Sequence, residues 1–134
     1  MVNMSVVYKG EKHCELTHGP SGSKIETDAP KDNQGLGAAF SPTDLVGAAL
    51  ASCILTTMAI MAERDGIDLK GATAQVSKEM TSNPRRIAQL PVEIKMPKYL
   101  KPEDRKRLEA AAHSCPVHHS LHPDIQAPIT FIYA

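Results

Sequence analysis

Three cysteines, Cys14, Cys53 and Cys115, are the residues of this chain with the most distinctive chemistry. Cys115 stands directly before Pro116 in the segment Ser-Cys-Pro-Val-His-His, where a proline can open a helical turn. A thiol at that position faces unpaired backbone N–H groups, which lower its pKa, and His118 follows three residues later as a possible partner. From the residues alone, Cys115 is therefore predicted to be the more strongly activated thiol.

Cys53 lies in an apolar segment and Cys14 in an alternating one, where a plain structural role is the simpler interpretation. Two thiols on two helices still permit dithiol chemistry, in which one thiolate attacks a substrate and the other resolves the sulfenic acid as a disulfide. The odd cysteine count and the lack of a C-x-x-C spacing argue against a secreted disulfide framework. The N-terminal sequence has no apolar signal core, so a cytoplasmic location is expected.

A metal site is a second interpretation of the segment around Cys115. Together with His118, His119 and His122 it forms a C-x-x-H-H-x-x-H pattern, whose ligand types suit zinc. All four residues fall within one short stretch, without a second ligand pair across a loop. Histidines around a surface turn are the simpler explanation, and metal binding stays open as an alternative function.

Composition limits the remaining functions. The 134 residues correspond to a single domain, 1–134. Fifteen basic residues balance fifteen acidic ones, which argues against a general nucleic-acid binder. Aromatic residues make up 4% of the chain and tryptophan is absent, so stacked aromatics for single-stranded nucleic acid are not expected either.

One long helix must carry Cys53. Ser41 can cap it, Pro42 suits its first position, and Asp44 complements the positive end of the helix dipole. The helix is predicted to run to about Arg64, with Gly66 as its stop.

Residues 45–62 of that helix carry no charge, and they would span roughly 27 Å, close to the thickness of a membrane. The many small residues and the amphipathic segments on either side favour a helix buried within protein. A chain of this size has little material to surround such a helix. A homodimer that packs two copies together is therefore expected, with no membrane association.

The other elements follow from hydrophobic period and turn residues. Strands are predicted over 2–9, 12–19, from 24 to 27, 68–80, 86–96 and 128–133, with a second helix from Pro102 to near Ser114. Residues 81–84 form a hairpin turn, and Pro91 marks a bulge or an edge. The order βββ-α-ββ-α-β predicts an α+β fold with antiparallel sheets.

Two segments together resemble the OsmC/Ohr family, the osmotically inducible protein C and organic hydroperoxide resistance group. The first runs from Ser41-Pro-Thr-Asp-Leu to Ala-Leu-Ala-Ser-Cys53, and the second is Cys115-Pro-Val-His-His. The resemblance covers nearly the whole chain in element order. It implies an intertwined homodimer, in which two long central helices are wrapped by sheets from both chains.

The resemblance also implies an antioxidant, stress-response activity. Many members are thiol-dependent peroxidases, in which the first cysteine, here Cys53, attacks an organic hydroperoxide and the second, here Cys115, resolves it. A dithiol reductant such as a lipoylated protein then restores both thiols, and the active sites lie at the dimer interface. The family thus assigns the attack to Cys53, whereas the residues alone favour Cys115.

The chain departs from the family at the groups that activate the first cysteine. Active members supply an arginine from the N-terminal strands, held by a glutamate ten residues before that cysteine. Here Thr43 occupies the glutamate position, and the first arginine of the chain is Arg64. Lys12, Lys24 and His18 are the candidates to replace the arginine.

An apolar wall beside the cysteines would favour alkyl or fatty-acid peroxides over hydrogen peroxide. The residues predicted to form it are Phe40, Leu50, Met58 and Met61, with Asp44 and His118 in supporting positions. A non-catalytic alternative uses the same interfacial pocket to bind a small apolar or thiol-reactive ligand.

Overall fold

A computed structural model describes all residues, 1–134, and contains eight strands, three α-helices and one 3-10 turn. In chain order these are β1 (Met4–Gly10), β2 (His13–His18), β3 (Lys24–Asp28), η1 (Lys31–Asn33), α1 (Pro42–Arg64), β4 (Thr73–Val76), β5 (Glu79–Thr81), β6 (Arg86–Gln89), β7 (Val92–Met96), α2 (Pro102–Ala112), α3 (Pro116–Ser120) and β8 (Ile129–Tyr133). They form two compact units, Met1–Val46 and Gly47–Ala134. The first unit contains one sheet, and the second contains two, a three-stranded sheet and the β5-β6 hairpin.

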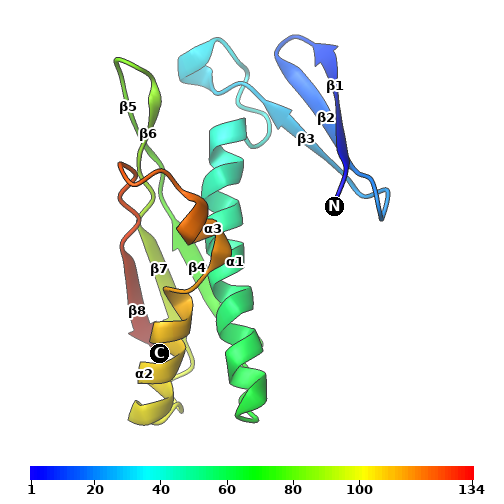
Figure 1. Ribbon diagram of the computed structural model, residues 1–134. Helices are drawn as coiled ribbons and strands as arrows, with labels where there is room; N and C mark the ends of the chain where they lie inside the picture. The colour runs from blue at the N-terminus through cyan, green and yellow to red at the C-terminus, as the bar shows by residue number, and fades with distance from the viewer. The chain divides into compact units, whose positions relative to one another are not determined.

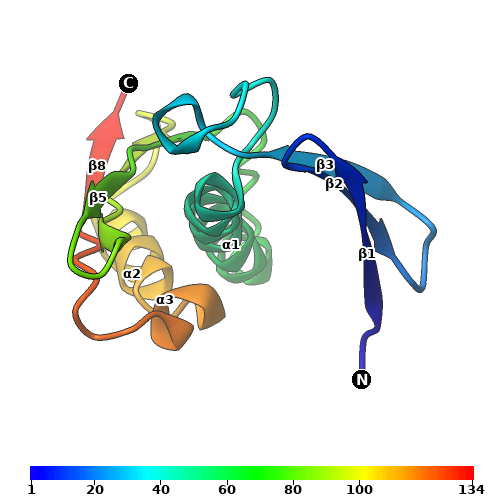
Figure 2. The same cartoon turned by 90° about the horizontal axis from the view of Figure 1, so that it is seen from above.

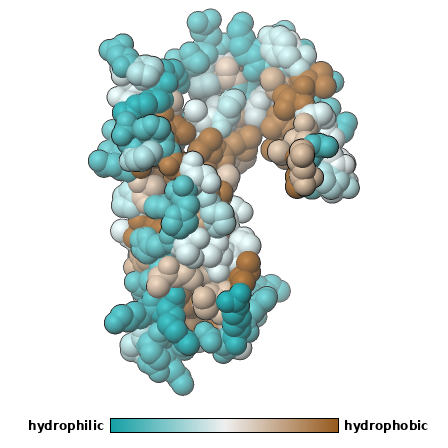
Figure 3. All heavy atoms as spheres, viewed as in Figure 1, coloured by the Kyte–Doolittle hydropathy of each residue, from teal (hydrophilic) through white to brown (hydrophobic).

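The first unit is a three-stranded antiparallel sheet with strand order β1-β2-β3 (Figure 1). Val6 pairs with Leu16 and Leu16 pairs with Ile25, so the three share one face of the sheet. Val6 is 61% exposed and Ile25 is 51% exposed, and Figure 3 shows apolar side chains at the surface of this unit. The apolar face of this sheet is therefore not covered within the unit.

The start of α1 is built as the sequence predicts. The Ser41 N–H donates to Asp44 Oδ2 at 2.9 Å, and the Asp44 N–H donates to Ser41 Oγ at 3.1 Å. This reciprocal pair is a capping box, which satisfies donors that the first helical turn leaves unpaired. The predicted cap is confirmed, and its hydrogen bonds give Asp44 a role at the end of the helix.

The second unit packs helices on one face of a sheet with strand order β4-β7-β8. Residues 47–64 of α1 and the whole of α2 lie against that face (Figures 1 and 2). Gly47 allows the close approach of helix and sheet, because a Cβ there would lie 3.2 Å from Leu90 Cδ2. The largest fully buried hydrophobic side chains form the core of the chain: Leu50, Ile54, Met58, Leu90, Ile94, Met96, Leu108 and Val92.

Only part of α1 is covered within the chain. One third of the apolar stretch of this helix is buried within the chain, and Ile60 is 53% exposed. By length and composition alone, α1 is the one helix long and apolar enough to cross a membrane. Its buried residues follow one another at helical spacing on the face toward the sheet, as in the core helix of a folded domain.

The sheet of the second unit corrects two predictions. It is not wholly antiparallel, because β8 runs parallel to β7, with Ile94 opposite Phe131. The chain between β7 and β8 passes through α2 and α3, and such a helical crossover brings a strand back in the same direction. The predicted strands 68–80 and 86–96 are each divided, and the second one breaks at Leu90 and Pro91, where the sequence predicts a bulge or an edge.

A polar cluster joins α2 to the last strand. The Tyr133 hydroxyl donates a hydrogen bond to the Glu109 carboxylate. The Arg105 guanidinium lies 4.1 Å from the centre of the Tyr133 ring, a cation–π contact. Arg105 also donates to the carbonyl oxygens of Leu100 and Lys98, each at 2.9 Å. These contacts hold α2 against β8.

Candidate active site

The second unit brings two of the three cysteines together. Cys53 lies in the middle of α1, and Cys115 lies between α2 and α3, 62 residues further along the chain. Their side chains lie close enough for each to shift the pKa of the other, and both are free thiols. Cys14 belongs to β2 of the first unit. The cysteine pair that the sequence singles out is thus a contact within one compact unit.

Cys115 is fixed by its place at the start of α3. It is completely buried and forms the N-cap of this short helix, with Pro116 in the first turn. Its sulfur accepts a hydrogen bond from the His118 N–H at 3.5 Å. The predicted position before a helical turn is confirmed, and the partner that His118 supplies is its backbone N–H.

Cys53 is half-buried, so its sulfur is the more accessible of the two. The Thr57 hydroxyl lies one turn further along α1, with Oγ1 3.9 Å from Cys53 Sγ. The backbone N–H of Val117, in the first turn of α3, also lowers the pKa of this thiol. Cys53 therefore interacts with a hydroxyl of its own helix, with the Cys115 thiol and with the start of α3.

These contacts separate the acidities of the two thiols. Burial alone would raise the pKa of Cys53, but hydrogen bonds from Cys115, Val117 and Thr57 bring it below its ordinary value. Burial raises the pKa of Cys115, and its hydrogen bond to Cys53 raises it further. The structure thus corrects the prediction that Cys115 is the more activated thiol. Cys115 is the buried donor of the pair, and Cys53 is the thiol favoured to ionise.

The histidines around α3 do not assemble a metal centre. No three His, Cys, Asp or Glu side chains of the chain come together as metal ligands. The His118 ring contacts the Ala127 carbonyl oxygen through Nε2 at 3.2 Å, while His122 Nδ1 accepts the Asp124 N–H at 3.0 Å. The ligand set that the metal-binding alternative requires, Cys115 with its neighbouring histidines, is therefore not assembled within the single chain.

The residues predicted for an apolar wall are scattered. Leu50 and Met58 are completely buried, so both pack the core and leave no surface for a ligand in the single chain. Met61 is half-buried on α1. Phe40 is 55% exposed and belongs to the first unit. Within the second unit, the structure does not gather these side chains around the cysteine pair.

Comparison with known proteins identifies the family. The family model for OsmC-like protein matches residues 33–129, which include both Cys53 and Cys115. This chain belongs to the OsmC-like family. No curated protein shows a significant match to the sequence.

Solved structures share the OsmC-like fold over almost the full chain. A proposed osmotic stress induced and detoxification response protein from Psychrobacter arcticus is 41% identical, with a TM-score of 0.93, covering 98% of this chain and 96% of that one. An organic hydroperoxide resistance protein OsmC from Legionella pneumophila is 19% identical, with a TM-score of 0.73 and the same coverages of 98% and 96%. Organic hydroperoxide resistance protein OhrB of Bacillus subtilis is 15% identical, with a TM-score of 0.69, covering 98% of this chain and 97% of that one.

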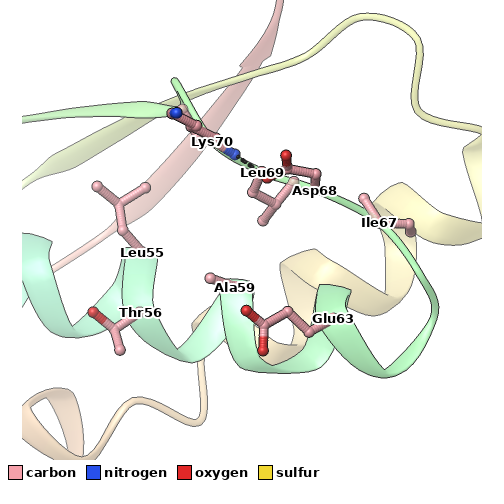
Figure 4. Close-up of a pocket in the computed structure, with 9 residues that line it drawn as sticks. Leu55, Thr56, Ala59, Glu63, Ile67, Asp68, Leu69 and Lys70 are labelled. Carbon is pink, nitrogen blue, oxygen red and sulfur yellow. Dashed lines mark hydrogen bonds between the residues drawn. The ribbon is translucent and has the colours of Figure 1, made fainter.

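This OsmC-like chain also has a shallow cavity of about 280 Å³ beside α1. Figure 4 shows it between the helix, with Leu55 and Ala59, and the segment that contains Leu69. Glu63 and Asp68 are among the polar groups that line it. Neither cysteine lines this cavity, so it is separate from the thiol pair.

Two groups beside Cys53 were not predicted from the sequence. Thr57 was detectable in principle, since a residue four positions after a helical cysteine lies on the same face one turn away. Val117 acts through its backbone N–H, a group that every residue except proline carries. Only the packing of α3 against α1 selects it.

Proposed function

We propose that this protein reduces organic hydroperoxides, with Cys53 as the attacking thiolate and Cys115 as the resolving thiol. One observation carries the proposal: the half-buried Cys53 sulfur lies beside the fully buried Cys115 thiol, whose interaction with it lowers the Cys53 pKa. A peroxide has direct access only to the more exposed sulfur, and that sulfur is the one whose anion is stabilised. The resolving thiol is already in contact with it.

The reaction has three balanced steps. The Cys53 thiolate attacks the outer oxygen of R–O–O–H, so an S–O bond forms as the O–O bond breaks. The leaving alkoxide takes a proton from water and departs as the alcohol. The Cys115 thiol then displaces hydroxide from the Cys53 sulfenic acid, which gives a disulfide and water. An external dithiol, such as a lipoyl group on a protein, reduces the disulfide and becomes oxidised itself.

The comparisons support the peroxide as substrate class. Two proteins with this fold, from Legionella pneumophila and Bacillus subtilis, are organic hydroperoxide resistance proteins. The more similar Psychrobacter arcticus protein has a proposed role in osmotic stress and detoxification. An alkyl peroxide also suits a half-buried thiol set in an apolar helix better than the more polar hydrogen peroxide.

A homodimer is part of the proposal. The sheet of the first unit exposes one apolar face, and most of the apolar stretch of α1 is not buried within the chain. Monomeric soluble proteins rarely expose apolar surface on this scale. A second copy of the chain would cover it, and the cysteine pair would then lie near the surface between the copies. Sedimentation equilibrium should give twice the chain mass at micromolar concentration.

The first test is the intact mass of the reduced protein after one equivalent of cumene hydroperoxide. We expect a loss of two hydrogens and a Cys53–Cys115 linked peptide on mapping. Cys14→Ser is the matched control and should give the same linked peptide. An unmodified mass, or a disulfide that includes Cys14 in place of Cys53, contradicts the proposal.

The same experiment distinguishes the peroxidase from the alternative of a protein that only binds a small ligand. If the pocket at the interface of the proposed dimer only binds a small thiol-reactive or apolar molecule, peroxide leaves both thiols reduced. Ligand affinity would then be the same in the Cys53→Ser variant. Stopped-flow consumption of cumene hydroperoxide with dihydrolipoamide as reductant gives the complementary readout, since only a peroxidase turns over.

A further inference from the structure

Two neighbouring threonines on α1 use their hydroxyl groups differently. Thr56 Oγ1 donates to the Ser52 carbonyl oxygen at 2.9 Å, the usual bond of a helical threonine to the residue four positions earlier. A hydroxyl has one proton, so this bond occupies the Thr56 donor. The Thr57 hydroxyl instead contacts the Cys53 sulfur, with the two atoms 3.9 Å apart. That distance is within the longer range of hydrogen bonds to sulfur.

Within the second unit, the groups that interact with the Cys53 sulfur are uncharged. Besides Thr57, it receives hydrogen bonds from the Cys115 thiol and the Val117 N–H. Of these three only Cys115 titrates, and its place as a buried donor keeps it protonated while Cys53 ionises. The chain has no arginine before Arg64 in sequence, so no guanidinium from the N-terminal strands stands beside the thiol. Within the second unit, a Cys53 thiolate is therefore stabilised by neutral donors.

We propose that Thr57 is a catalytic residue of the peroxide reaction, whose hydroxyl donates a hydrogen bond to the Cys53 thiolate. The inference rests on the proposed function and adds to it the group that takes part of the activating role of a cation. Hydrogen bonds to an ionised acceptor are roughly twice as strong as those between neutral groups. The hydroxyl keeps its own proton throughout, so the balance of the three steps above is unchanged.

Loss of this donor has two opposite effects on the reaction rate. The Cys53 pKa rises, so less thiolate is present at neutral pH. The thiolate that does form is more nucleophilic, because nucleophilicity rises with thiol pKa with a Brønsted coefficient of about 0.4–0.5. For each tenfold loss of thiolate, the remaining thiolate therefore gains about threefold in reactivity. A donor role thus predicts pH profiles that cross.

The experiment measures alkylation of Cys53 by iodoacetamide from pH 5 to 10, followed on the Cys53 peptide by mass spectrometry. We expect Thr57→Val to be alkylated about threefold more slowly than the wild type at neutral pH and about threefold faster at the alkaline limit. Thr57→Ser keeps the hydroxyl and should follow the wild type. Thr56→Val is the matched control one residue away, and its profile should not move.

Parallel profiles for Thr57→Val and the wild type overturn the proposal, and so does an equal change in Thr56→Val. Slower alkylation of Thr57→Val at every pH also overturns it, because that result indicates a packing defect. Alkylation does not require peroxidase activity, so the two proposals fail separately. If the profiles cross but the protein does not consume peroxide, the Thr57 hydrogen bond is supported and only the peroxidase function is contradicted.

Discussion

Two pairs of side chains in the second unit each contain an interaction between two acidic groups, and the pairs differ in whether one member is an accessible nucleophile. In one pair the Cys115 thiol donates to Cys53, and in the other the Tyr133 hydroxyl donates to Glu109. In both pairs the donor is held in its neutral form, so its pKa is raised. The acceptor in the first pair is a nucleophile, whereas the acceptor in the second is a carboxylate.

The surroundings of each pair decide whether its interaction serves reactivity or stability. The Cys53 sulfur is half-buried and stands beside a second thiol that can bond to it covalently, so stabilising its anion prepares a reaction. Glu109 and Tyr133 lie between α2 and β8, with Arg105 stacked on the ring, so the same kind of hydrogen bond holds two elements together. Similar geometry therefore supports reactivity in one place and stability in the other.

The largest expected effect comes from removing the nucleophile. Cys53→Ser should lower peroxide consumption with dihydrolipoamide by at least about a thousandfold, because a serine hydroxyl is hardly ionised near pH 7. Cys14→Ser should keep the wild-type rate. The measurement is initial rate by stopped flow, and substantial turnover by the Cys53→Ser variant would remove this cysteine from the attacking role.

The donor of the first pair is tested by comparing Cys115→Ser with Cys115→Ala. Both variants should lose steady-state turnover, because neither can form the disulfide. They should differ in the first step: serine still offers an O–H donor, whereas alanine offers none and lets the Cys53 pKa rise. We expect sulfenic acid formation at pH 6, trapped with dimedone, to be several-fold slower in Cys115→Ala.

Equal trapping rates in these two variants would mean that the Cys115 proton contributes nothing to the acidity of Cys53. Thermal melts of both proteins serve as the control for folding, since Cys115 is completely buried. Alanine leaves a small cavity there, which is expected to cost stability without changing the slope of the pH profile.

The first pair also shows how far sequence reasoning reaches. Ser41, Pro42 and Asp44 are a local signal, and the helix start that they predict is the one found. The sequence segments around Cys53 and Cys115, with the family resemblance, predict that these two cysteines form the reactive pair. Which thiol ionises was not predictable from local position, because that depends on the burial of Cys115 and on the Val117 N–H.

The sheet shows the same limit. Alternation of apolar residues located β7 and β8, but strand direction depends on the path of the chain between them. The apolar residues predicted to form a wall beside the cysteines are not found together, for a related reason. Leu50 and Met58 share the helix with Cys53, yet the core of the second unit takes up their whole surface. Hydropathy marks a residue as apolar without saying whether core or ligand covers it.

The second pair should affect stability and not chemistry. Tyr133→Phe removes the hydrogen bond to Glu109 and keeps the ring under Arg105, so we expect a loss of about 1–2 kcal/mol in the free energy of unfolding. Tyr99→Phe is the matched control, because the Tyr99 hydroxyl donates to the Asp68 carbonyl oxygen at an exposed site. Urea unfolding at pH 7 measures both. A larger loss for Tyr99→Phe, or slower peroxide reduction in Tyr133→Phe, would contradict the contrast between the two pairs.

The smallest expected effect is a pH dependence that only the second pair contributes. Burial and the hydrogen bond to Glu109 raise the Tyr133 pKa above its ordinary value near 10. The phenol of the folded chain stays neutral at a pH where that of the unfolded chain ionises, so its contribution to stability is complete below about pH 10 and declines as the pH rises beyond it. The lysines also titrate there, so the quantity to measure is the difference in unfolding free energy between the wild type and Tyr133→Phe. That difference should be constant from pH 7 to 9 and shrink between pH 10 and 11, whereas a constant difference through pH 11 would mean that the Tyr133 hydroxyl ionises as readily in the folded chain as in the unfolded one.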